Sequence, residues 1–154
     1  MPPPLPVVEV RYARPTDRLE DVVRFYRDGL GFDVIGGFEG HAGYDGVFLA
    51  LPGRRDHLAF TYRHDGAPSP RDHLELTRHR GGGPGGAPSP DHLLVLYIED
   101  ERAIREAAAR LAAMGYPEVE PENPYWRGRA VTVADPDGWR VALAAPRGSA
   151  PALA

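Results

Sequence analysis

The sequence predicts an α+β protein in which one strand–helix–three-strand unit occurs twice. Three observations lead to this fold class. Short segments alternate apolar and polar residues as strands do, two longer segments carry apolar residues at helical spacing, and the order of these segments is the same in both halves of the chain. With 154 residues, of which 42% are hydrophobic, the chain can build one domain or two small halves that share a core.

The first half is expected to span residues 1–62. Residues 7–13 alternate as a strand, and Thr16 or Asp17 can cap the helix that follows. The apolar side chains of that helix recur at helical spacing, at positions 19, 22, 23, 26 and 30. Three further strands are predicted, at residues 32–38, 44–51 and 57–62.

The second half, residues 91–145, repeats this order. A strand is expected at residues 92–98, and Asp100 can cap a helix that ends at Gly115. Three strands follow, at residues 116–120, 129–134 and 139–144. The last two form a hairpin around residues 135–138 (DPDG), whose two aspartates we interpret as turn-forming residues rather than general acids.

A Gly- and Pro-rich linker, residues 63–90, separates the halves and contains part of a tandem duplication. The tripeptide Asp-His-Leu recurs, at residues 56–58, 72–74 and 91–93. The sequence GAPSP precedes its second and third copies, so one strand has been copied together with its linker. Only one of residues 57–62 and 73–79 is needed as the fourth strand of the first half. The short turn before residue 57 favours the first copy, and the second copy is the alternative.

Composition excludes several classes of protein. The chain has no cysteine, which excludes disulfides and thiolate sites. Its formal net charge of −4 argues against nucleic-acid binding. No apolar run approaches the roughly 20 residues of a membrane span, and the first residues lack the features of a signal peptide. We therefore expect a cytoplasmic protein without a nucleic-acid or membrane partner, ending in a flexible tail at residues 146–154.

Two segments resemble the signatures of one superfamily. Residues 22–32 (VVRFYRDGLGF) resemble its helix-to-strand signature, and residues 135–141 (DPDGWRV) resemble the motif at its last hairpin. Over roughly residues 7–144, the chain is thereby similar to the vicinal oxygen chelate proteins, which include glyoxalases, bleomycin resistance proteins and dioxygenases. This resemblance implies that each βαβββ module forms half of a curved mixed sheet and that the two halves enclose a cup.

The resemblance also locates the positions at which enzymes of this superfamily hold a divalent metal. In this chain these positions are Arg11, Ala59, His92 and Ala142. Because arginine is a fixed cation without an acceptor and alanine has no ligand atom, no metal or other cofactor is expected. If the second copy forms the fourth strand, Glu75 replaces Ala59. Glu75 and His92 could then hold a metal, and the alternative function is a metal-dependent lyase, isomerase or dioxygenase.

Without a metal, the resemblance to the bleomycin resistance branch implies a protein that binds and sequesters a small aromatic or antibiotic-like molecule. It also implies a homodimer whose interface contains the cup. Strand parity and aromatic loop residues give the candidate ligand-binding residues, which are Glu9, Arg11, Tyr44, Phe48, His57, His92, Tyr125, Trp126 and Arg127. No catalytic residue is predicted, and acid–base catalysis by Glu9 or Glu75 is a third alternative.

Overall fold

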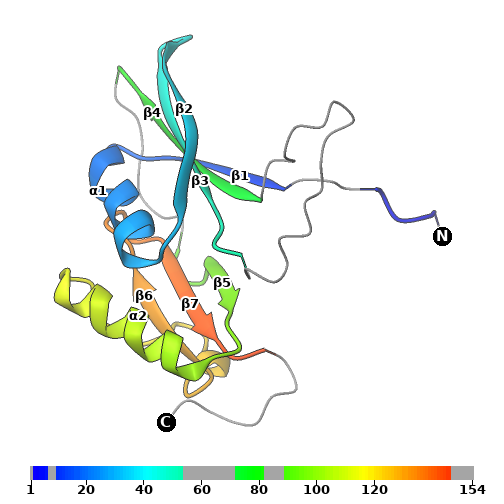
Figure 1. Cartoon of the computed structure of the whole chain (residues 1–154), viewed down its shortest axis with the longest axis vertical. Helices are drawn as coiled ribbons and strands as arrows, with labels where there is room; N and C mark the ends of the chain where they lie inside the picture. The colour runs from blue at the N-terminus through cyan, green and yellow to red at the C-terminus, as the bar shows by residue number, and fades with distance from the viewer. Residues whose placement is uncertain (1, 7–9, 54–71, 82–88, 147–154) are drawn as a thin grey trace.

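The computed structural model describes residues 2–6, 10–53, 72–81 and 89–146, whose strands form two sheets (Figure 1). In this part of the chain, the first sheet has four strands in the order β1 (Arg11–Pro15), β4 (His73–His79), β3 (Tyr44–Ala50) and β2 (Asp33–His41). The second sheet has three described strands, in the order β5 (Leu93–Tyr97), β7 (Arg140–Ala144) and β6 (Ala130–Ala134).

The two sheets have the same topology, as the repeated unit predicts. β1 is parallel to β4 and β5 is parallel to β7, whereas the other neighbouring strands are antiparallel. The strand predicted at residues 116–120 is reduced to a bridge between Glu118 and Val133, because Pro117 and Pro121 remove backbone donors on either side. This bridge lies beside β6 in the second sheet. It has the same position there as β2 has beside β3 in the first sheet. The predicted α+β fold of two related modules is therefore confirmed.

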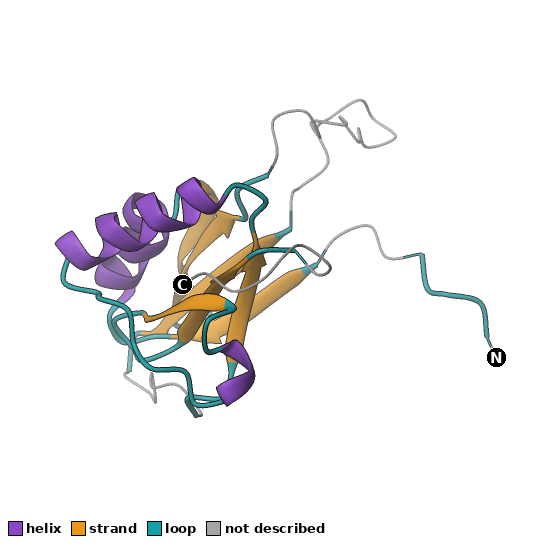
Figure 2. Ribbon diagram, turned by 90° about the horizontal axis from the view of Figure 1, so that it is seen from below, coloured by secondary structure: helices purple, strands orange, loops and turns teal. Residues whose placement is uncertain are grey.

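The helices α1 (Leu19–Arg24) and α2 (Glu101–Ala113) lie on the same side of the strands (Figure 2). α1 continues into a π-helical turn, η1 (Phe25–Gly29). The predicted cap of α2 is confirmed, because the Asp100 side chain accepts a hydrogen bond from the N–H of Arg102. In the part of the chain that the structure describes, no helix is long and apolar enough to cross a membrane.

A shared core joins the two modules where α1 and η1 meet α2. The rings of Phe25 and Tyr116 pack edge to face at 5.0 Å. Gly29 lies against the side chain of Leu111, where a Cβ atom would clash, and its carbonyl accepts a hydrogen bond from Arg110 at 3.0 Å. A larger residue at position 29 would push the helices apart, so this glycine sets how closely the modules approach.

In the structure, the second copy of the duplicated segment occupies the position of the fourth strand of the first module, where the sequence favoured residues 57–62. β4 pairs with β1 and β3, and residues 54–71, which include the first copy, lie outside the described residues. β1 also begins later than predicted, at Arg11, and includes Pro15. Proline is compatible with this position because β1 lies at the sheet edge, where one side of the strand needs no donor.

Ion pairs explain why the second copy fits this position. On β4, Glu75 lies 3.7 Å from Arg11 of β1, and Arg78 contacts Glu20 of α1 at 2.9 Å and Asp45 of β3 at 3.2 Å. The first copy has alanine and tyrosine at the two corresponding positions and cannot form these pairs. Both copies have the same alternation of apolar residues, so charge rather than hydrophobic pattern distinguishes them.

Candidate functional site

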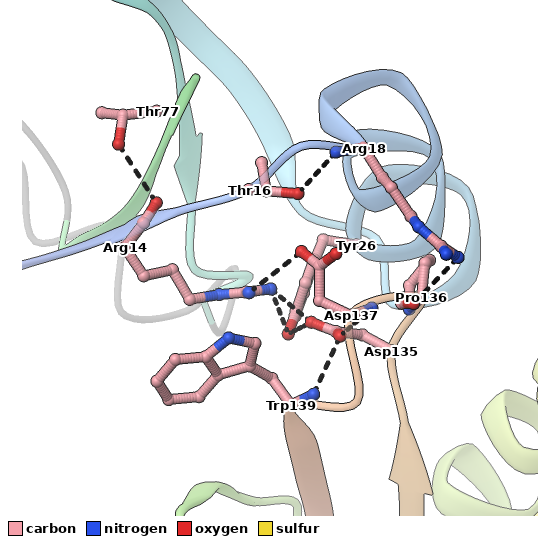
Figure 3. Close-up of polar contacts among 9 residues, drawn as sticks. All are labelled: Arg14, Thr16, Arg18, Tyr26, Thr77, Asp135, Pro136, Asp137 and Trp139. Carbon is pink, nitrogen blue, oxygen red and sulfur yellow. Dashed lines mark hydrogen bonds and ion pairs between the residues drawn. The ribbon is translucent and has the colours of Figure 1, made fainter. Parts of the chain in front are cut away.

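A buried ionic bridge joins β1 of the first module to the last hairpin of the second (Figure 3). Arg14, which is 3% exposed, forms an ion pair with Oδ2 of Asp135 and lies 3.5 Å from Asp137. The Tyr26 hydroxyl donates a hydrogen bond to the same Asp135 oxygen at 2.7 Å. Oδ1 of Asp135 accepts from the N–H groups of Asp137 and Trp139, which confirms the turn-forming role predicted for Asp135.

Burial controls the protonation of this bridge. It raises the pKa of the Asp135 carboxyl above its usual value, and the adjacent Arg14 cation opposes that rise. Burial also raises the pKa of Tyr26 well above its usual value, and the negative charge of Asp135 adds to this effect. The Tyr26 hydroxyl therefore stays protonated at neutral and moderately alkaline pH, and it donates a hydrogen bond to Asp135.

A pocket of about 390 Å³ lies against this bridge, and we call it the junction pocket because both modules line it. Tyr12 and His92 meet the Trp139 ring edge-on, with ring centroids 6.2 and 6.4 Å away, and the Arg14 guanidinium lies 5.0 Å from its centroid. The lining residues are Val10, Tyr12, Arg14, Tyr26, Leu51, His73, Leu74, His92, Leu93, Leu94, Trp139 and Arg140. A concave, mostly apolar pocket of this size suits a small organic molecule.

The other face of the first sheet carries a second group of side chains, contributed by β1, β3 and β4, which we call the Arg11 cluster: Arg11, Phe48, His73 and Glu75. Nε of Arg11 donates to Nε2 of His73 at 3.0 Å, and its guanidinium lies 5.0 Å from the centre of the Phe48 ring. Its Nη1 lies 3.7 Å from the Glu75 carboxylate. His73, 4% exposed, also lines the junction pocket and so connects the two groups.

The second module has a different surface on the corresponding face of its sheet. Alternate residues of β6 and β7 form two cross-strand pairs, Ala130 with Ala144 and Thr132 with Ala142. We call these four buried residues the alanine floor. The 3₁₀ turn η3 (Pro124–Trp126) places the indole of Trp126 on the alanines of this floor. Position Ala142, which the resemblance assigns to a metal ligand, is thus one of the small residues beneath an aromatic ring.

The structure brings some of the predicted ligand-binding residues together and separates others. Arg11 and Phe48 are in contact within the Arg11 cluster. Tyr125 and Trp126 contact each other in η3, with ring centroids 5.0 Å apart. His92 lies apart from both pairs, in the junction pocket. These five residues therefore occupy three places rather than one cluster.

The remaining predicted residues lie elsewhere. Tyr44 shares the face of β3 that carries Phe48 but lies at the other end of the strand, 44% exposed. Arg127 forms an ion pair with Glu120 at 2.8 Å on the surface. Three residues of the predicted site and ligand positions lie outside the described residues: Glu9, His57 and Ala59.

Sequence reasoning missed several residues of the junction pocket. Tyr12 and Arg14 were not recognised because they alternate with Arg11 on the face of β1 that points toward the helices, where an arginine is not expected. His73, in the second copy of the duplicated tripeptide, and Trp139, which is partly buried, also line the pocket. The available signal was Trp139, which directly follows the DPDG turn.

The donor set of the Arg11 cluster does not suit a divalent metal. His73 and Glu75 lie on one face of β4, but the Arg11 guanidinium contacts both. Across the described ranges, no three His, Asp or Glu side chains converge as a group that could hold a metal ion. Because arginine cannot lose its proton in a protein, a cation in this place opposes a second cation.

Comparison with known proteins identifies close relatives. Residues 10–61 match the family model of the YycE-like N-terminal domain, and residues 91–145 match that of the YycE-like C-terminal domain. The chain is 41% identical over 140 residues to the uncharacterized protein YycE of Bacillus subtilis (strain 168), covering 91% of this chain and 89% of that protein. The crystal structure of a YycE protein from Bacillus subtilis superposes with a TM-score of 0.75 at 39% identity, over 92% of both chains.

More distant proteins share the fold. Glyoxalase I of Leishmania major superposes with a TM-score of 0.62 at 20% identity, covering 88% of this chain and 84% of that one. An antibiotic binding protein from Streptomyces sp. CB03234 gives a TM-score of 0.60 at 24% identity, covering 92% and 98%. The fold, the two domain matches and the relationship to YycE agree: the chain belongs to the YycE-like family of the vicinal oxygen chelate superfamily.

Proposed function

We propose that this protein binds a small aromatic molecule without a metal ion and sequesters it, acting as a homodimer. The observation that carries the proposal is the placement of the Arg11 guanidinium against Glu75, His73 and Phe48. Arg11 lies on β1 beside β4, and the resemblance assigns one metal ligand to each of these two strands. A fixed positive charge there favours binding of an anionic or aromatic group over binding of a metal.

Arg11 competes directly with any metal for the two donors of β4. It is the cation that pairs with Glu75, and it donates to Nε2 of His73, whose lone pair a metal would need. A metal that used either donor would have to displace the guanidinium or remain beside its charge, and repulsion between cations is strong where water is excluded. His73 is buried, so this repulsion would be poorly screened.

The junction pocket supports an aromatic ligand. Tyr12, His92 and Trp139 present ring edges and faces to one cavity, and flat molecules pack favourably in such surroundings. Arg140 and the two pocket histidines supply polar groups at its lining, which can orient a ligand that carries a carboxylate or carbonyl. The Streptomyces protein with the same fold is an antibiotic binding protein, which is consistent with a ligand of this kind.

The sheet edges support a dimer. β1 and β5 are end strands in the part of the chain described, and each contributes residues to the junction pocket. An end strand offers unpaired backbone groups to another chain. A second copy that covers these edges would enclose the pocket and complete a cup.

Metal content and ligand binding test this function in one preparation. Protein purified without chelator should contain far less than stoichiometric Zn, Ni, Mn or Fe by mass spectrometry. A thermal-shift screen of flat aromatic compounds should reveal ligands that raise Tm, since a ligand at 100 times its Kd adds about 2.7 kcal/mol of stability. Arg11→Met keeps the length of the side chain but removes its charge and should weaken binding of anionic aromatic compounds.

The adjacent donors His73 and Glu75 favour one alternative, a metal-dependent lyase, isomerase or dioxygenase. Stoichiometric metal that is lost in Glu75→Gln or His92→Ala would establish it and overturn metal-independent binding. Incubation with an identified ligand separates sequestration from metal-free catalysis. Chromatography should recover the ligand unaltered, whereas turnover that disappears in Glu75→Gln would contradict sequestration.

A further inference from the structure

The alanine floor has a feature that neither the junction pocket nor the Arg11 cluster explains. Thr132 is 1% exposed, and its hydroxyl has no hydrogen-bond partner among the residues that the structure describes. Buried hydroxyl groups are normally paired because desolvation without a partner is unfavourable. An unpaired hydroxyl in a floor of alanines therefore marks a place where a partner from outside the chain would be stabilising.

The geometry of the floor suits a flat ring. Its two cross-strand pairs place three methyl groups and one threonine side by side on the same face of β6 and β7. Val95 of β5 extends this apolar surface beside Ala142. No side chain longer than valine rises from these positions, so the surface can accept the face of an aromatic ring.

Trp126 already places such a ring on the floor. Of the three residues in η3, Tyr125 is 53% exposed, and only Trp126 packs against the buried alanines. The indole belongs to the small cluster around these alanines, separate from the main core that joins the helices. Trp126 can therefore leave the floor without disturbing the main core. While it is there, the Thr132 hydroxyl has no partner.

We propose that the alanine floor is a subsite for a flat aromatic ring carrying a carbonyl or hydroxyl group, and that Trp126 occupies this subsite until the ligand replaces its indole. The inference rests on the proposed function for the class of ligand. It adds a ring-binding surface formed by residues that do not line the junction pocket, the residue that recognises the ring's oxygen and the side chain that competes with the ring.

Selectivity follows from the difference between the two occupants. An unsubstituted ring exchanges one apolar contact for another and gains little over the indole. A ring with a carbonyl fills the same surface and also accepts a hydrogen bond from the Thr132 hydroxyl, and a ring hydroxyl can donate one to it. Buried polar groups discriminate strongly between ligands that do and do not pair with them.

Two matched probes test this difference: fluorenone-2-carboxylate and fluorene-2-carboxylate, which differ in one ring carbonyl. Calorimetric titration of the full chain should show tighter binding of fluorenone-2-carboxylate. Thr132→Val, which keeps the shape but removes the hydroxyl, should weaken its binding about tenfold, or 1.4 kcal/mol, and leave the fluorene probe unchanged. Thr77→Val is the matched control, because the Thr77 hydroxyl already donates to the Arg14 carbonyl at 3.3 Å. It should leave the ratio of the two affinities unchanged.

The sign of the change in Trp126→Ala distinguishes a competitor from a ligand contact. Removing a competing indole should tighten binding of both probes, by about tenfold for a contact worth 1.4 kcal/mol. Weaker binding of both probes in Trp126→Ala and in Trp126→Leu, or an unchanged preference in Thr132→Val, would overturn the inference but leave aromatic binding intact. If neither probe binds the wild type or any variant, both the inference and the proposed aromatic ligand are overturned. Binding seen only after Trp126 is removed supports the inference.

Fluorescence gives a second, independent readout. The chain contains two tryptophans, so in Trp139→Phe the emission comes from Trp126 alone. Displacement from the floor into water should shift this emission to longer wavelength when fluorenone-2-carboxylate is added. Binding without such a shift means that the indole stays on the floor, which contradicts displacement.

Discussion

Arg14 and Tyr26 stabilise the contact between the modules through one carboxylate. A buried guanidinium is tolerated here because Asp135 and Asp137 surround it and because the Tyr26 hydroxyl supplies a further hydrogen bond to Asp135. Removing one partner of a buried ion pair typically costs about 3–5 kcal/mol, because the other charge remains buried. The stability of the two-module arrangement thus depends on a few atoms.

The raised pKa of Tyr26 predicts a loss of stability in alkaline solution. The folded protein keeps the Tyr26 proton, whereas the unfolded chain loses it above a pKa of about 10. This contribution is fully present below that pH, and the free energy of unfolding should fall as pH rises beyond it. Urea denaturation between pH 8 and pH 11 measures the effect. Tyr26→Phe should be less stable at pH 8 but show a smaller alkaline decline, whereas Tyr97→Phe, at an exposed position, should decline as the wild type does.

Local polar contacts could be predicted from the sequence, and distant ones could not. The caps at Asp100 and Asp135 involve backbone groups within four residues, so residue type and spacing were sufficient. The ion pair of Arg14 with Asp135 spans 121 positions. No spacing rule relates residues so far apart, and the same limit hid the contacts of Arg11 with His73 and Glu75.

Among the elements, β4 shows how similar segments are distinguished by their surroundings. Its apolar residues Leu74 and Leu76 are buried, as any strand of this pattern requires. Its charged residues meet partners on three other elements, β1, β3 and α1. A pattern of alternating residues predicts that a strand forms, but only the partners decide which of two copies enters the sheet.

Truncating Leu76 tests the assignment of β4. Leu76 is fully buried in the hydrophobic core, so Leu76→Ala should lower the free energy of unfolding by about 2–5 kcal/mol. Val34→Ala, at a β2 position that is 48% exposed, is the control and should change stability by less than about 0.5 kcal/mol. Chemical denaturation followed by circular dichroism measures both. A loss in Leu76→Ala no larger than that of the control would mean that the second copy is not the core strand.

At the scale of the whole molecule, repetition explains the fold better than it explains the site. The order of strands and helices and the superfamily signatures were sufficient for the fold, because each depends on local pattern. The candidate site depends on which faces of the two sheets meet. Parity predicted only which face of its strand Arg11 shares, and the contact of Arg11 with Phe48 is seen in the structure alone. Parity also could not show that Tyr12 and Trp139 from different modules line one pocket.

A dimer in solution is the prediction that belongs to this scale. Among the described strands, β1 and β5 are end strands that border the junction pocket, and an end strand can pair with another chain, so association should cover them. Sedimentation equilibrium at micromolar concentration should give twice the mass of the chain. A monomer at this concentration would remove the dimer from the proposed function, and ligand binding by that monomer would show that one chain suffices.

The ionic bridge also bears on the order in which parts of the chain can fold during synthesis. Asp135, the partner of Arg14, is synthesised 121 residues after it. Until then, the Arg14 guanidinium lacks its carboxylate partner and has the neutral Tyr26 hydroxyl beside it. We therefore expect burial of Arg14 to be unfavourable in a nascent chain that still lacks Asp135. The two modules are copies of one plan, yet the first should bury its arginine only after the last hairpin of the second has been made.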